Sequence, residues 1–182
     1  MTDLLFSLET RSGTLQDAGI AANQAAESMV FTSYQNRRPI NTQRAQRAAL
    51  AIFAQFMAEC GIQPTGDLYS DPSAWQGVTW GIVQSFQAWQ LQKGYAIKTI
   101  NDRVSTIKVY MTMANTAGII PDGEILRLQS LKSFSPKEAF DTDEKRTTEG
   151  ISTRRGLKKI HATAITEEQA RALCTVRNET PQ

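Results

Sequence analysis

The chain of 182 residues is poor in the side chains that carry most enzyme chemistry. It has two cysteines, Cys60 and Cys174, and a single histidine. These numbers exclude a disulfide framework, and neither cysteine has metal-ligand spacing. A Ser-His-Asp set and a glycine-rich phosphate loop are also absent. We therefore expect no catalytic or metal site, no cofactor and no small-molecule substrate, and we interpret the cysteines as reduced thiols of a cytoplasmic protein.

Long hydrophobic runs are missing as well. The densest apolar run covers residues 48–54, far fewer than the about 20 residues that a membrane-spanning helix needs. The first thirty residues mix charges with short apolar runs, which is not the pattern of a signal peptide. We expect no membrane partner.

Strand signals are scarce, and helical periodicity takes their place. No alternation of β-branched and polar residues lasts five positions, and no Asn-Gly hairpin occurs. Apolar residues recur at helical spacing in 41–62, from 75 or 79 to 93, and in 98–120, with a shorter helix in 122–132. The sequence therefore predicts an all-α fold.

The helix predicted between 98 and 120 has two distinct stripes. The apolar stripe consists of Ile100, Val104, Ile107, Met111, Ala114 and Gly118. A polar stripe about 100° round the helix consists of Asn101, Ser105, Lys108, Thr112 and Asn115. This second stripe contains no carboxylate, and amides, hydroxyls and lysine are side chains that read base edges. We therefore expect Asn101, Ser105 and Lys108 to approach a DNA groove.

The net charge of +2 hides three basic blocks. Residues 37–47 contain four arginines and no acid, 93–108 contain four cations and one acid, and 154–159 contain four cations and no acid. Such blocks are usually solvated surface. Their position at helix starts and in a linker indicates a polyanionic partner, because lysine and arginine neutralise phosphates.

The chain divides into four parts. Residues 1–36 are an N-terminal arm, either a loose helix or unstructured, and 37–132 form the helical bundle. Residues 133–164 are polar and charged, as in a mobile basic linker. In 165–182 a new helix begins, where Thr166 and Gln169 have the spacing of a capping box.

Three segments together resemble the N-terminal half of a tyrosine recombinase of the phage-integrase type. The first has Thr42, Phe53 and Phe56 at the family's spacing, with Gln46 where tyrosine is usual. The third, "AITEEQARAL", resembles the opening of the family's catalytic domain. The second matches the family's helix junction at Gly94, Thr99, Ile100, Arg103, Val104, Ser105 and Ile107.

The resemblance implies a SAM-like core-binding bundle of four to five helices that clamps one face of duplex DNA. Sister recombinase protomers on the same DNA would be its partners. DNA integration or recombination, by strand exchange through a phosphotyrosine, would belong to the full-length protein. His161 does not match the family's His-x-x-Arg because Ala164 occupies the fourth place. As given, the chain is expected to be a non-catalytic fragment.

The tyrosines support the expectation that the chain is non-catalytic. All four precede the half of the family that holds the nucleophile, so none is assigned that role; they are Tyr34, Tyr69, Tyr95 and Tyr110.

The candidate DNA-contacting residues come from the basic blocks and the polar stripe. For a single arginine, the alternative is plain solvated surface. Thr99 is interpreted mainly as a helix cap, and Arg103 could instead pair with an acidic neighbour. Four cations at a helix N-terminus oppose its macrodipole, so we expect another gain, such as phosphate contact, to hold them there. The resemblance to tyrosine recombinases favours that contact for Arg44 and Arg47. The full set is Arg37, Arg38, Gln43, Arg44, Arg47, Lys93, Lys98, Thr99, Asn101, Arg103, Ser105, Lys108, Arg154, Arg155, Lys158 and Lys159.

Two other functions remain open. The chain could be a stand-alone helical DNA-binding regulator, although the two short helices and tight turn of a helix-turn-helix are not found. It could also be a helical protein-interaction domain that binds no nucleic acid. Salt dependence of DNA binding separates this last possibility from the others.

Overall fold

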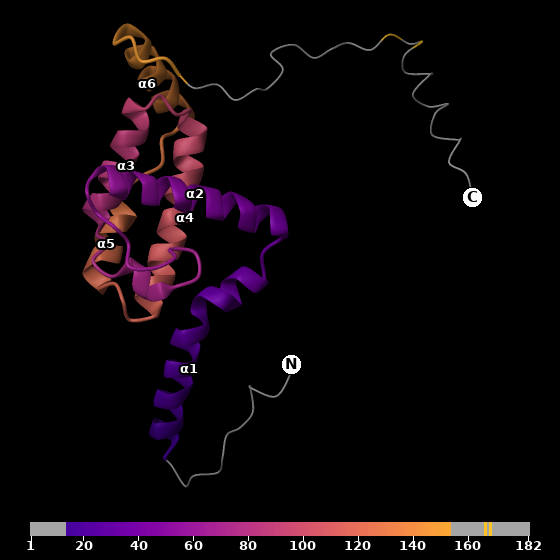
Figure 1. Cartoon of the computed structure of the whole chain (residues 1–182), viewed down its shortest axis with the longest axis vertical. Helices are drawn as coiled ribbons and strands as arrows, with labels where there is room; N and C mark the ends of the chain where they lie inside the picture. Colours follow the sequence, from indigo (N-terminus) through magenta and orange to yellow (C-terminus); the bar gives the residue numbers. More distant parts are fainter. Residues whose placement is uncertain (1–13, 154–165, 167, 169–182) are drawn as a thin grey trace.

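The computed structural model describes residues 14–153, 166 and 168. Over these residues the chain is helical, which confirms the predicted all-α class (Figure 1). In this part of the chain, no helix combines the length and apolar content needed to cross a bilayer. In chain order the elements are α1 (Leu15–Asn36), α2 (Ile40–Glu59), the 3-10 helix η1 (Pro72–Trp75), α3 (Trp80–Gln92), α4 (Ile97–Thr116), α5 (Asp122–Ser130) and α6 (Pro136–Thr148).

Helix α4 is the central helix of the bundle, and its apolar stripe is the core. The predicted members Ile100, Ile107, Met111 and Ala114 are all fully buried. Gly118 was predicted to belong to this stripe, but it is exposed and has a φ of 74°. It follows the end of α4 as a left-handed residue that glycine adopts without a steric penalty.

Aromatic rings fill the space between α4 and its neighbours. Phe53 of α2 lies with its ring centroid 5.0 Å from Phe86 of α3 and 6.0 Å from Trp75 of η1. The indole of Trp75 donates a hydrogen bond to the carbonyl of Leu68, 2.9 Å away. This bond fastens the loop before η1 to the core, so the polar edge of a fully buried ring is satisfied.

Helix α1 settles the open question about part of the N-terminal arm. Thr14 and Asp17 form a capping box that begins the helix. Its C-terminal part packs on the bundle through Phe31, whereas its N-terminal part projects away from it (Figure 1). Leu15, near the outer end, is 91% exposed.

Helix α6 corrects the part of the predicted linker 133–164 that covers Pro136–Thr148, and residues 154–164 lie outside the described residues. Ser135 and Glu138 form a capping box, and Pro136 occupies the first helical position, where it is well tolerated. Arg146 is buried and donates to the carbonyls of Leu91 and Tyr95, each at 2.9 Å. The helix was missed because a polar side chain, not an apolar stripe, attaches it to the bundle.

Candidate nucleic-acid interface

A short bend at residues 37–39 joins α1 to α2. The side-chain amide of Gln43 donates to the carbonyls of Gln35, at 3.1 Å, and Arg38, at 3.0 Å. These carbonyls lie at the C-terminal end of α1, where main-chain acceptors lack helical partners. Gln43 was predicted to contact DNA, but its amide group is used to hold this bend.

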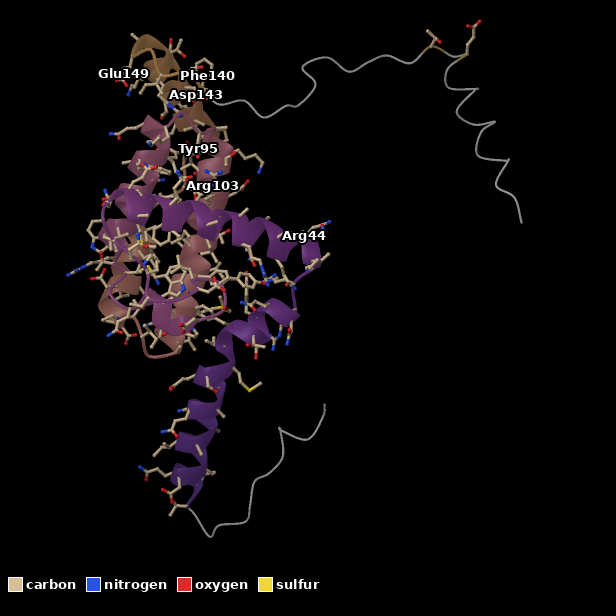
Figure 2. All side chains as sticks on the ribbon, in the orientation of Figure 1. Arg44, Tyr95, Arg103, Phe140, Asp143 and Glu149 are labelled. Atoms are coloured by element: carbon tan, nitrogen blue, oxygen red, sulfur yellow. The ribbon has the colours of Figure 1, made fainter. Side chains whose placement is uncertain are left out.

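Four exposed arginines surround the bend, and we call them the basic corner: Arg37, Arg38, Arg44 and Arg47. Among the residues that the structure describes, no carboxylate oxygen forms an ion pair with any of them. Figure 2 shows Arg44 at the N-terminal end of α2, directed away from the bundle. The pKa of Asp67 is lowered mainly by its hydrogen bond to Ser70 and, to a smaller extent, by the charge of Arg47. The corner is therefore a patch of positive charge that is exposed and not ion-paired, although Arg47 is partly balanced by Asp67.

The helix ends explain why these cations are tolerated. Arg37 and Arg38 follow the C-terminus of α1, where positive charge is favourable, so they do not simply oppose a macrodipole as the sequence suggested. Arg44 lies beyond the first turn of α2. That first turn contains no acidic residue and no capping side chain. Its main-chain N–H groups therefore add to the positive potential of the corner.

Two arginines of the corner lie on tyrosine rings. The guanidinium carbon of Arg38 is 4.5 Å from the ring centroid of Tyr34, and that of Arg47 is 4.1 Å from the ring of Tyr69. Both rings contact Tyr110, at centroid separations of 6.0 and 5.9 Å. A guanidinium 4.1 to 4.5 Å from a ring centroid is attracted to the face of that ring.

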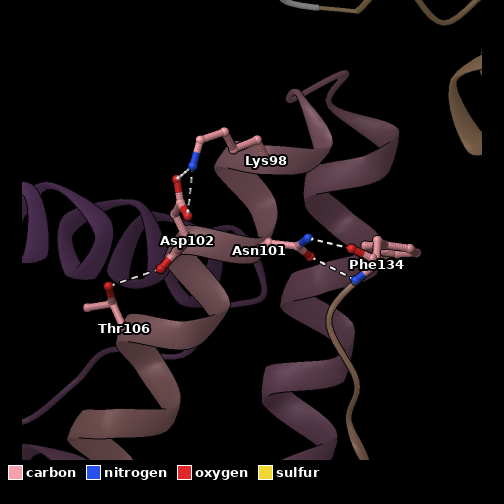
Figure 3. Close-up of polar contacts among 5 residues, drawn as sticks. All are labelled: Lys98, Asn101, Asp102, Thr106 and Phe134. Carbon is pink, nitrogen blue, oxygen red and sulfur yellow. Dashed lines mark hydrogen bonds and ion pairs between the residues drawn. The ribbon is translucent and has the colours of Figure 1, made fainter. Parts of the chain in front are cut away.

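The polar stripe of α4 has a different environment. Both atoms of the Asn101 amide group bond to the main chain of Phe134: its nitrogen donates to the carbonyl at 2.8 Å, and its oxygen accepts from the N–H at 3.0 Å (Figure 3). Phe134 lies between α5 and α6. The same two atoms would be needed to read an adenine, so Asn101 is not available for a base.

Lys108 and Asn115 continue the same pattern along α4. The Lys108 ammonium donates to the carbonyl of Leu131, at the end of α5, and burial lowers the pKa of Lys108. The Asn115 amide donates to the carbonyl of Ile120, at 2.8 Å, and to Asp122, at 2.7 Å. The prediction of an open, groove-facing stripe is therefore wrong for Asn101 and Lys108.

The first turns of α4 carry three more candidates and one correction. The predicted cap, Thr99, lies inside the helix, because Ala96 occupies the N-cap position and no side chain caps it. Lys98 forms an exposed ion pair with Asp102 at 3.1 Å (Figure 3). Ser105 is exposed. Of the three stripe residues predicted to meet DNA, which are Asn101, Ser105 and Lys108, only Ser105 is exposed.

Arg103 and Lys93 both have intramolecular partners. Arg103 donates to the Gln90 side-chain oxygen at 3.2 Å, and its guanidinium lies 4.2 Å from the ring centroid of Tyr95. The alternative considered for Arg103 was an acidic partner, but the partners found are an amide and a ring. Lys93 forms an ion pair with Glu59 at 3.1 Å.

A shallow groove of about 300 Å³ lies where α2 passes α4. Its α2 side is made of alanines, whose small side chains allow another backbone to approach closely. It includes Thr99 and Arg103, whereas Arg47 lines a different depression with Asp67 and Tyr69. The full lining is Ala45, Ala48, Ala49, Thr99, Asp102, Arg103 and Thr106.

Four predicted residues and two missed ones complete the comparison of sequence and structure. The basic tetrad Arg154, Arg155, Lys158 and Lys159 lies outside the described residues.

The roles of Tyr34 and Tyr69 beneath the arginines were not predicted. The spacing of Tyr34 and Arg38 by four residues could have suggested their contact. No local signal connects Arg47 with Tyr69, which lies in a distant loop.

Comparison with known proteins yields no relative. No protein-family model matches the chain, and neither a curated protein nor a solved structure does. The resemblance to tyrosine recombinases therefore rests on the three sequence segments alone, and a function has to be argued from the surface itself.

Proposed function

We propose that this chain binds double-stranded DNA through the basic corner, as the core-binding domain of a site-specific tyrosine recombinase. The observation that carries the proposal is the exposure of all four corner arginines without an ion-paired carboxylate among the described residues. Exposed charge of one sign raises the local concentration of an oppositely charged partner. The groove between α2 and α4, which Thr99 and Arg103 line, is a second surface for the DNA backbone in this proposal.

The chemistry of arginine favours phosphate as the group that is bound. A guanidinium remains charged at any physiological pH, and its planar N–H donors match two oxygens of a phosphate. Each neutralised phosphate also releases condensed counterions, so binding should weaken as salt rises. With four such contacts, a plot of log binding constant against log salt concentration should have a slope no steeper than about −4.

In this proposal the chain grips DNA but does not cut it. Burial raises the pKa of the Tyr110 phenol, so it is a poor nucleophile. Tyr34 and Tyr69 lie beneath arginines. The strand-exchange nucleophile would belong to the full-length recombinase, and sister protomers would share the DNA in the cytoplasm.

A helical protein-interaction domain is the second candidate, and one observation favours it. The projecting part of α1 exposes Leu15, Ile20 and Met29, by 91%, 52% and 43%. Exposed apolar side chains on one helix are a feature of protein-binding surfaces. The basic corner has no role in that alternative, so a measurement of DNA binding distinguishes the two.

The test is a fluorescence-anisotropy titration of a labelled duplex from low to high salt. We expect micromolar or weaker affinity that declines steeply with salt. The matched control is Arg127→Ala on α5, since Arg127 is exposed but paired with Glu124 at 3.1 Å. Binding that is absent at low salt, or that is indifferent to salt, would reject the proposal and favour the interaction domain.

A further inference from the structure

We propose that Tyr34 and Tyr69 are positioning residues of the basic corner. Their rings hold Arg38 and Arg47 so that the N–H edges of the two guanidiniums face outward, ready for phosphate oxygens. This inference rests on the proposed DNA-binding function and specifies how its surface is organised.

A guanidinium that lies flat on a ring uses its face and leaves its N–H edge available. All five N–H donors of arginine lie in the guanidinium plane. Within residues 14–153, the side chains of Arg38 and Arg47 donate no hydrogen bond. Arg103 also lies over a ring, but it donates to Gln90. Ring contact with unused donors is therefore a property that Arg38 and Arg47 share.

The rings of Tyr34 and Tyr69 are held in place by hydrogen bonds at their hydroxyls and by packing on Tyr110. The Tyr34 hydroxyl accepts a hydrogen bond from the Gln46 amide at 2.7 Å. The Tyr69 hydroxyl donates to the Gln43 side-chain oxygen at 3.1 Å. Both rings also contact Tyr110, which is fully buried. A ring that is bonded at its hydroxyl and packed on its other side cannot swing away from the arginine.

A consequence for binding follows from side-chain entropy. Ordering a long, flexible side chain at an interface costs free energy, and a side chain that is ordered beforehand avoids part of that cost. Arg38 and Arg47 are ordered in this way without any ligand. Arg37 and Arg44 have no ring contact in the described part of the chain, so they are the comparison within the same surface.

The first experiment is a double-mutant cycle on Tyr34 and Arg38, because Tyr34 is only half-buried. Tyr34→Leu should weaken DNA binding about two- to fivefold, the range of an exposed cation–π contact. In the Arg38→Ala background the same change should have no further effect. Tyr34→Phe keeps the ring and should weaken binding less than Tyr34→Leu. Thermal unfolding of each variant verifies that it is folded.

A second variant tests the arginine fork without touching the core. Arg47→Lys retains the charge but replaces a planar fork with a point charge. We expect weaker binding at low salt with a nearly unchanged salt slope. Equal affinity of Arg47→Lys and the unmodified chain would overturn the role of the fork.

The outcomes separate this inference from the proposed function. If the unmodified chain binds no DNA at low salt, both fail. If it binds, and Tyr34→Leu costs as much with Arg38→Ala as without it, the tyrosine acts on the fold and only the positioning role fails. Loss of the Tyr34 effect in the Arg38→Ala background supports the proposal.

Discussion

The polar stripe of α4 and the basic corner look alike in sequence, but they have opposite environments. Both are rich in hydrogen-bond donors. Asn101 and Lys108 of the stripe bond to the main chain between 131 and 134, whereas the corner arginines remain exposed. The difference lies in the supply of acceptors. Helix α5 has nine residues and ends at an extended Leu131, so its last carbonyls lack helical partners and need donors from elsewhere.

At the corner, one glutamine donates hydrogen bonds to main-chain carbonyls at a helix end, as the polar stripe does at the end of α5. The Gln43 amide donates to two carbonyls at the C-terminal end of α1, so the arginines are not required for that purpose. A short amide therefore serves the fold, and the long cations are left for a partner.

The largest expected effect comes from the core side of α4. Ile107 is fully buried, so Ile107→Ala should lower the free energy of unfolding by roughly 2–5 kcal/mol. Chemical denaturation measures it. At a temperature where the variant remains folded, DNA affinity should be unchanged. A loss of less than 1 kcal/mol would show that this side of α4 is not the core.

The stripe should behave as a structural element. Asn101→Ala removes two hydrogen bonds and leaves the half-buried main chain of Phe134 unpaired, which should cost about 1–3 kcal/mol. DNA affinity should not change. The matched control is Ser105→Ala on the exposed part of the stripe, expected within about 0.5 kcal/mol. If Asn101→Ala weakens DNA binding at unchanged stability, the contrast between the two surfaces disappears.

The corner should show the reverse behaviour. Arg44→Ala should reduce the salt slope of DNA binding by about one unit, as expected for one lost phosphate contact. Its unfolding free energy should change by less than about 0.5 kcal/mol. A variant that unfolds earlier but binds DNA as before would place Arg44 among the structural residues.

The smallest effect concerns the protonation of Lys108. Burial lowers its pKa from the ordinary value of 10.5, so just below pH 10.5 the unfolded chain binds more protons than the folded one. Stability from this group therefore rises with pH in that window. Denaturation at several alkaline pH values should show the unmodified chain gaining stability relative to Lys108→Met. A constant difference between the two would contradict the desolvation of this lysine.

Some of the fold could be predicted because its signal is local. The stripe of Ile100, Ile107 and Met111 follows the helical period, and each member is buried. The short helix predicted in 122–132 corresponds to α5, Asp122–Ser130. Helix α6 was missed because its attachment depends on Arg146. The sequence alone does not distinguish a buried arginine from an exposed one.

The sequence by itself determined the helical class, the core face of α4 and the presence of a basic corner, because hydrophobic period and charge are properties of neighbouring residues. Only the tertiary structure decided which polar side chains remain available to a partner. The main-chain acceptors of Lys108 and Asn101 lie 23 and 33 residues away. Such pairs are fixed when the bundle closes, and each donor that satisfies a buried carbonyl is lost to any ligand.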